Sequence, residues 1–164
     1  QSFHEALALA FEFYTKVMVE SAVQGREIEV SVLGNTDLTV SVPGEIVANT
    51  EFYSYESKYI DESGAALEIP ARLEQPVAEK IRQTAYDVYR ALDCEGMARV
   101  DVFLAEDGAV IVNEVNTLPG FTSISMYPKL LEASGISYPE LLDRLVELAV
   151  ERHQLNTELK TDLL

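Results

Sequence analysis

The sequence is poor in cysteine and contains no long apolar run. A single cysteine, Cys94, excludes an internal disulfide and a zinc site built from several cysteines. Near the end of a helical pattern, such a residue is more often a small buried apolar group than a nucleophile. No apolar stretch approaches membrane-spanning length, and the amino terminus has no signal-peptide pattern. The expected location is therefore the cytoplasm.

Positive charge is also scarce in this chain. It has 12 basic residues against 28 acidic ones, which gives a net charge of -16. Such a surface repels nucleic acid and anionic membranes, so neither is expected as a partner. An anionic substrate such as a nucleotide would need metal ions and a few well-placed cations to bind. The 164 residues, of which 48% are hydrophobic, suffice for one packed domain.

The hydrophobic periodicity predicts both helices and strands. A helix capped by Ser2 is expected to run to about Tyr14, followed by a short strand at 16–21 and a longer one at 25–35. Regular periodicity fades between 48 and 64, where a functional loop or lid is expected. The remaining expected elements are a β-rich stretch at 38–47 with a turn at Pro43-Gly44, a short strand at 66–71, and helices at 76–92, 127–133 and 138–152.

An Asp-Gly pair at 107–108 between alternating apolar runs predicts a β-hairpin with a two-residue type I′ turn. That register places Asp101 opposite Glu114 and Arg99 opposite Asn116, with all four side chains on one face. Strict alternation along the second strand also puts Val112 on this face.

Two carboxylates that face each other repel, so a positive group must lie near Asp101 and Glu114. Arg99 can be that group, in a buried or half-buried ion-pair network. The alternative is a divalent cation held by Asp101, Glu114 and Asn116, because ligands that are all oxygen suit Mg²⁺ or Mn²⁺. The residues alone leave both interpretations open.

Three stretches together resemble the carboxy-terminal half of D-alanine–D-alanine ligases, which are ATP-grasp enzymes. They are GREIEVSVLG (25–34), MARVDVFL (97–104) and VNEVNTLPGFTSISMYP (112–128). The resemblance covers nearly all of 2–149 and implies an α+β fold, a mostly antiparallel sheet with helices packed on it. It also implies three parts: a remnant of the central subdomain at 1–25 (helix, strand and adenine hinge), a catalytic domain at 26–152 with a mobile loop at about 48–64, and a polar tail at 153–164.

In this family ATP phosphorylates the carboxylate of one D-alanine, and the amine of a second D-alanine attacks the acyl phosphate. The product is the dipeptide used in peptidoglycan. Two Mg²⁺ or Mn²⁺ ions would neutralise the triphosphate. The resemblance makes Asp101, Glu114 and Asn116 their ligands.

The resemblance also assigns the other site residues. Arg99 would polarise the reacting carbonyl, and the backbone N–H of Gly120 would hold the developing oxyanion. Lys58 and Tyr59 would lie on the mobile loop that, in this family, closes over the phosphates and the second substrate. The remaining positions are Ser125 and Met126 for the second substrate's carboxylate, Glu20, Ser21, Ala22 and Val23 for adenine, Glu27 for the ribose hydroxyls, and Phe52 and Phe103 for the flanks of the adenine.

The sequence also departs from the family pattern. The amino-terminal domain, the phosphate-binding lysines and the Gly/Ser-rich loop are absent, so the chain is interpreted as a fragment of a longer protein that cannot ligate by itself. Its parent is expected to be a homodimer. Relatives that make D-alanyl-D-lactate carry a histidine in the mobile loop, whereas the two histidines here, His4 and His153, are remote from it. The dipeptide is therefore favoured. The alternatives are another ATP-grasp carboxylate–amine ligase, such as a D-alanine–D-lactate ligase, and a non-catalytic nucleotide-binding module.

Overall fold

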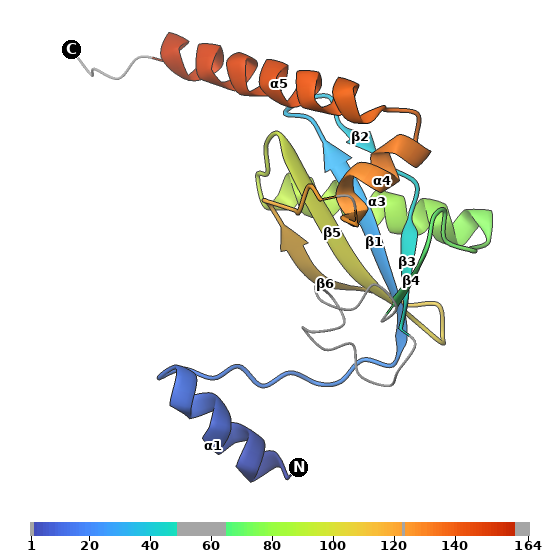
Figure 1. Cartoon of the computed structure of the whole chain (residues 1–164), viewed down its shortest axis with the longest axis vertical. Coiled ribbons are helices and arrows are strands. Elements are labelled where there is room, and N and C mark those ends of the chain that lie inside the picture. Colours follow the sequence, from blue (N-terminus) through green and yellow to red (C-terminus); the bar gives the residue numbers. More distant parts are fainter. Residues whose placement is uncertain (1, 49–64, 123, 160–164) are drawn as a thin grey trace.

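A computed structural model describes residues 2–48, 65–122 and 124–159. Its centre is a six-stranded sheet in the order β4-β3-β1-β5-β6, with the short β2 paired to β1 (Figure 1). Every pairing is antiparallel. The strands are β1 (Gly25–Leu33), β2 (Thr39–Val40), β3 (Gly44–Ala48), β4 (Ala65–Glu68), β5 (Met97–Ala105) and β6 (Val110–Asn116).

Helices pack on both faces of the sheet, which confirms the predicted α+β fold. Helix α3 (Gln75–Ala91) covers one face, while α4 (Met126–Ala133) and α5 (Tyr138–Glu158) lie at one end of the opposite face (Figure 1). Helix α1 (Phe3–Phe13) stands apart from the sheet and buries none of its residues. No helix in the described part of the chain combines the length and the hydropathy needed to cross a membrane.

Alternation along β1 and β5 separates a core face from a polar face. The core lies between the sheet and α3. It contains Ile28, Val30 and Val32 of β1, Ala98, Val100 and Val102 of β5, and Ile81, Ala85 and Tyr89 of α3. Each large apolar side chain buried in this way stabilises the fold by about 1.5–3 kcal/mol. The intervening residues of the same strands are polar and point away from α3, so the packing of the core fixes the polar face.

The β5–β6 hairpin differs from its predicted form at the turn. Gly108, with φ +80°, donates its N–H to the Ala105 carbonyl at 2.9 Å, and the Ala105 N–H donates to Ala109, also at 2.9 Å. The loop is therefore 106–108, three residues with glycine in the left-handed region, and the predicted two-residue type I′ turn is wrong.

A β-bulge then restores the predicted register further along the hairpin. Val102 pairs with Val112, whereas Asp101 pairs with Glu114, so Asn113 is the extra residue of β6. The bulge cancels the one-residue shift at the turn. Cross-strand partners share a face, so Val112 faces α3 with Val102 rather than the polar face, and that prediction is wrong.

The turn predicted at Pro43-Gly44 is wrong, because β2 and β3 both pair antiparallel with β1 and the chain runs on in one direction through 41–44. Most of the other predicted elements are present with small changes in their bounds. Ser2 caps α1, as predicted, and the structure adds that Glu5 completes a capping box with it. The strand predicted at 16–21 is wrong, because the described segment 14–24 contains no regular element. Helix α5 continues to Glu158, so roughly half of the predicted polar tail is helical. The predicted loop at 48–64 lies almost wholly outside the described residues.

Candidate active site

A row of carboxylates crosses β1, β5 and β6 on the face turned away from α3. Glu29 pairs with Asp101, and Asp101 pairs in turn with Glu114. The predicted pairing of Asp101 with Glu114 is therefore confirmed. Neighbouring strands lie about 4.8 Å apart, so adjacent members of this row repel one another.

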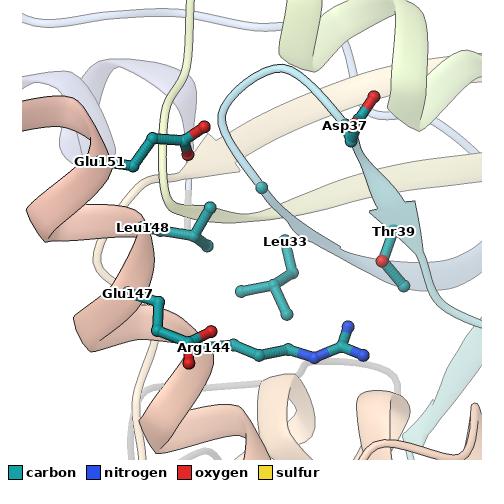
Figure 2. Close-up of a pocket in the computed structure, with 8 residues that line it drawn as sticks. Leu33, Asp37, Thr39, Arg144, Glu147, Leu148 and Glu151 are labelled. Carbon is teal, nitrogen blue, oxygen red and sulfur yellow. The ribbon is translucent and has the colours of Figure 1, made fainter. Parts of the chain in front are cut away.

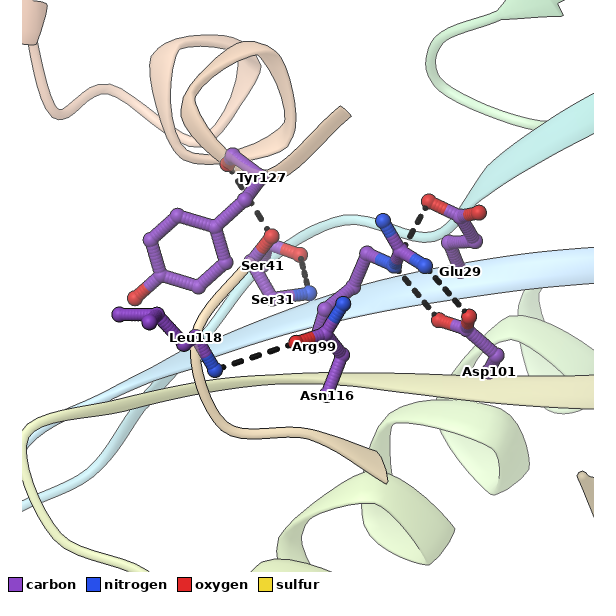
Figure 3. A network of polar contacts seen from close by, with 8 residues as sticks. All are labelled: Glu29, Ser31, Ser41, Arg99, Asp101, Asn116, Leu118 and Tyr127. Carbon is purple, nitrogen blue, oxygen red and sulfur yellow. Dashed lines mark hydrogen bonds and ion pairs between the residues drawn. The ribbon is translucent and has the colours of Figure 1, made fainter. Parts of the chain in front are cut away.

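Arg99 lies in the next row, between Ser31 of β1 and Asn116 of β6. Its guanidinium reaches into the carboxylate row (Figure 3). Nε and Nη2 donate to Oδ1 and Oδ2 of Asp101, both at 2.7 Å, and Nε lies 3.0 Å from Oε2 of Glu29. The ion-pair network, one of the two interpretations that the sequence allowed, is thus present. It contains one carboxylate from each of two adjacent strands.

Arg99 keeps its charge because of these neighbours. Burial lowers the pKa of Arg99, but the hydrogen bonds to Asp101 and the charges of Glu29, Asp101 and Glu114 outweigh it and hold the pKa above its ordinary value. The side chains of Arg99, Glu29 and Asp101 are 16%, 6% and 12% exposed. Leaving one charge of such a group without a partner costs about 3–5 kcal/mol.

The predicted cation ligands fit a hard divalent ion in their chemistry. Asp101, Glu114 and Asn116 supply only oxygen atoms, as Mg²⁺ prefers. The Asn116 Oδ1 accepts a hydrogen bond from the Leu118 N–H at 3.1 Å, which fixes the amide toward the loop (Figure 3). Among the described residues, no three Asp, Glu, His or Cys side chains gather closely enough to hold a metal ion. A cation here would therefore use Asn116 and ligands from outside the chain, such as phosphate oxygens.

Two of the predicted nucleotide residues lie beside the carboxylate row. Glu27 pairs with Phe103, and both side chains are half-buried. A small cavity, about 20 Å³, joins them to the row; it is lined by Glu27, Ile28, Glu29, Asp101, Val102, Phe103, Asn113 and Glu114. It has room for about one water molecule. A nucleotide bound to these residues would therefore lie across the face of the sheet rather than inside it.

The predicted adenine hinge at 20–23 lies outside the strands of the sheet. Glu20, Ser21, Ala22 and Val23 lie in the segment before β1, and all except Val23 are exposed. Their predicted contact with adenine remains a prediction. Phe52, Lys58 and Tyr59 lie outside the described residues.

The loop that follows β6 folds around Ser125. The Ser125 Oγ accepts a hydrogen bond from the Thr122 N–H at 2.9 Å and lies 2.9 Å from the Thr122 Oγ1. Gly120 is packed against the same hydroxyl, since a Cβ added there would lie 2.8 Å from it. The Met126 side chain is buried in a small apolar cluster, so its backbone is the part available to a substrate. The loop thus brings together Gly120, predicted to hold the developing oxyanion, and Ser125, predicted to hold the carboxylate of the second substrate.

We expect Gly120→Ala to disturb this loop, because the new methyl group displaces the Ser125 hydroxyl from Thr122. The lost hydrogen bonds should lower the free energy of unfolding by about 1 kcal/mol. Thermal denaturation of the natural polypeptide that carries this sequence measures the change. The matched variant is Gly120→Ala combined with Ser125→Ala, in which the clash is absent. If the double variant is less stable than Ser125→Ala alone by the same amount, the clash is not the cause.

Buried polar contacts fasten the start of α4 to β1. The Tyr127 hydroxyl donates to the Val32 carbonyl at 3.0 Å, and the Ser31 hydroxyl donates to the Tyr127 carbonyl at 3.1 Å. The Ser31 N–H donates to the Ser41 Oγ at 2.9 Å (Figure 3). These positioning roles were not predicted from the sequence. Ser31 has the pattern of an ordinary polar residue in an alternating strand, and Tyr127 has the pattern of a residue on an apolar helix face.

A larger pocket lies elsewhere, between α5 and the turn after β1 (Figure 2). Its volume is about 260 Å³, and it is lined by Leu33, Gly34, Asp37, Thr39, Arg144, Glu147, Leu148 and Glu151. None of the predicted site residues is among them. Its acidic side chains outnumber its single arginine, which disfavours phosphate groups. Of these two places, the carboxylate row is therefore the better candidate site for a nucleotide, despite its smaller cavity.

Comparison with known proteins agrees with the resemblance in the sequence. A family model described as the D-Ala D-Ala ligase C-terminus matches residues 1–147. The chain belongs to the D-alanine–D-alanine ligase family. It is 56% identical over 161 residues to a D-alanine–D-alanine ligase of Oceanobacillus iheyensis, which covers 98% of this chain and 44% of that protein. The chain thus spans less than half the length of that family member.

Solved structures of family members share the fold. The D-alanine–D-alanine ligase of Coxiella burnetii superposes with a TM-score of 0.82 at 42% identity, over 95% of this chain and 40% of that one. The Bacillus anthracis ligase complexed with ATP gives a TM-score of 0.77 at 32% identity, over 93% of this chain and 49% of that one. The ATP-grasp fold predicted from the resemblance is therefore confirmed.

Proposed function

We propose that this chain is the carboxy-terminal part of an ATP-dependent D-alanine–D-alanine ligase. The observation that carries the proposal is the placement of Arg99, Asp101, Glu114 and Asn116 on one face of the β5–β6 hairpin. Family membership and the ATP complex of a solved relative support it. Two Mg²⁺ or Mn²⁺ ions, a homodimeric parent and a cytoplasmic location are parts of the same proposal.

The proposed reaction has two steps. The γ-phosphoryl group of ATP passes to the carboxylate of one D-alanine, which leaves ADP and an acyl phosphate. The amine of the second D-alanine then attacks the carbonyl carbon, forms the peptide bond and expels phosphate. Negative charge develops at the phosphoryl oxygens in the first step and at the carbonyl oxygen in the second. Both steps therefore need a site that stabilises anions.

The residues of this chain divide that work. Divalent cations, when bound, would neutralise the triphosphate of ATP. Asp101, Glu114 and Asn116 would hold them. Arg99, charged at every pH compatible with folding, would stabilise the carbonyl oxygen as it becomes negative. The N–H of Gly120 would add a second donor to that oxygen.

Other residues would bind the substrates. Ser125 and the backbone of Met126, at the N-terminal end of α4, would bind the carboxylate of the second D-alanine. Glu27 would bind the ribose of ATP and Phe103 would pack beside the adenine. The hinge at 20–23 and the loop residues Phe52, Lys58 and Tyr59 complete the proposed site.

A coupled assay on the natural polypeptide tests this proposal. We expect phosphate release from ATP to require D-alanine, and mass spectrometry to identify D-alanyl-D-alanine as the product. D-lactate, offered beside D-alanine as the acceptor, should give much less product at neutral pH. Turnover that prefers D-lactate would favour the depsipeptide ligase. ATP binding without any D-alanine-dependent turnover would favour the non-catalytic module.

A further inference from the structure

We infer that Glu29 is the resident counterion of Arg99, a positioning residue that lets Asp101 be shared with a bound cation. This inference rests on the proposed function. Glu29 is 4% exposed and lies on β1, in the strand position directly opposite Asp101. Its Oε2 is 3.0 Å from the Arg99 Nε. Figure 3 shows Arg99 between the two carboxylates.

The inference starts from a conflict at Asp101. Both of its oxygens accept hydrogen bonds from Arg99 at 2.7 Å, which is the geometry of a strong bidentate pair. A cation held by Asp101 would compete with Arg99 for the same negative charge. The cation and the guanidinium would also repel each other. Arg99 therefore needs a second carboxylate if it is to stay in place while Asp101 serves the cation.

Glu29 is placed to be that second carboxylate and not a cation ligand. Across the sheet the order is Glu29, Asp101, Glu114, so Glu29 lies on the far side of Asp101 from Glu114. At about 4.8 Å per strand, the backbones of Glu29 and Glu114 are roughly 10 Å apart. A cation between Asp101 and Glu114 therefore has Arg99 and Glu29 behind it. This is how groups outside the ligand shell tune a metal site.

Glu29→Gln is the test, because glutamine keeps the shape and removes the charge. In the natural polypeptide with a non-hydrolysable ATP analogue, Mn²⁺ affinity should fall by about tenfold or more, measured by electron paramagnetic resonance. The kcat at low Mg²⁺ should fall while the KM for D-alanine changes little. High Mg²⁺ should restore part of the rate, because the cation then displaces Arg99 from Asp101. Glu29→Asp, which keeps the charge, should retain more Mn²⁺ affinity than Glu29→Gln.

Glu45→Gln is the matched control. Glu45 is 8% exposed and accepts hydrogen bonds from Arg26 at 2.8 and 2.6 Å, so it is another buried glutamate paired with an arginine on the same sheet. The thermal midpoint should fall in this variant as much as in Glu29→Gln or more. Its Mn²⁺ affinity should not change. If Glu29→Gln behaves in the same way, Glu29 has only a structural role and the inference is overturned.

A double-mutant cycle with Arg99→Met separates a counterion from a direct ligand. If Glu29 acts through Arg99, adding Glu29→Gln to Arg99→Met should leave Mn²⁺ affinity unchanged. A tenfold loss in that background would make Glu29 a cation ligand instead and overturn the inference. Arg99→Lys serves as the background if Arg99→Met does not fold. A smaller Glu29→Gln effect in that background supports the counterion role, and an undiminished tenfold loss would overturn it. A wild-type protein without D-alanine-dependent turnover defeats the proposed function, whatever the variants show.

Discussion

Glu114→Gln is expected to reduce D-alanine-dependent phosphate release about a hundredfold or more in the natural polypeptide. The cation is proposed to supply several kcal/mol of charge stabilisation in the transition state, and about 3 kcal/mol corresponds to a hundredfold in rate. Glutamine keeps the shape of the side chain but removes the negative charge that would hold the cation. The assay is the same coupled measurement at saturating ATP and D-alanine.

Stability separates this effect from simple damage to the fold. Glu114 is exposed and stands opposite Asp101, so the substitution removes a repulsion of a few tenths of a kcal/mol, which offsets the lost attraction between Glu114 and Arg99. The thermal midpoint should therefore stay the same or rise slightly while activity is lost. Glu106→Gln is the matched control, because Glu106 is an exposed acid in the loop of the same hairpin. A near-normal rate for Glu114→Gln would defeat the proposed role of Glu114 as a cation ligand.

Alternation and the Asp-Gly turn signal predicted much of the polar face correctly. Part of this success arose because two irregularities in the hairpin cancel each other. The pairing of Asp101 with Glu114 was correct although the predicted turn was one residue too short. The bulge at Asn113 returns the strand to the expected register. Periodicity counts residues along one strand and cannot detect an extra residue in the turn and another in the strand. Val112 was placed on the wrong face for this reason. It lies between the three-residue turn and the bulge, so its side chain faces α3 and not the polar face.

The burial of Glu29 could not be predicted from the pattern of a single strand. In the alternating pattern of 25–35, Glu29 falls on the polar face, and such a position is expected to contact solvent. It is buried because β1 pairs with β5, a strand distant in sequence, and Arg99 then reaches across to it. The strand predicted at 16–21 failed for a related reason. A strand needs a hydrogen-bonded neighbour, and no described strand pairs with that segment.

Tyr127→Ala is the substitution for which we expect the largest loss of stability. Tyr127 is fully buried, packs against Phe121 with ring centroids 5.6 Å apart, and donates its hydroxyl to the Val32 carbonyl. Burial raises the pKa of Tyr127, so it remains a donor throughout the pH range of interest. Removal of a buried aromatic ring costs about 3–5 kcal/mol, which urea denaturation of the natural polypeptide would measure.

Tyr127→Phe isolates the hydroxyl and links stability to substrate binding. Its expected loss is about 1–2 kcal/mol, because the Val32 carbonyl loses a buried partner. Since Tyr127 fastens the start of α4, the variant should also raise the KM for the second D-alanine more than it lowers kcat. Tyr86→Phe is the control, because Tyr86 is 39% exposed on α3 and should show neither effect. Equal KM values for Tyr127→Phe and the wild type would mean that α4 keeps its position without this hydrogen bond. The hydrogen bond from Ser31 and the apolar cluster around Met126 would then suffice to hold the proposed carboxylate site.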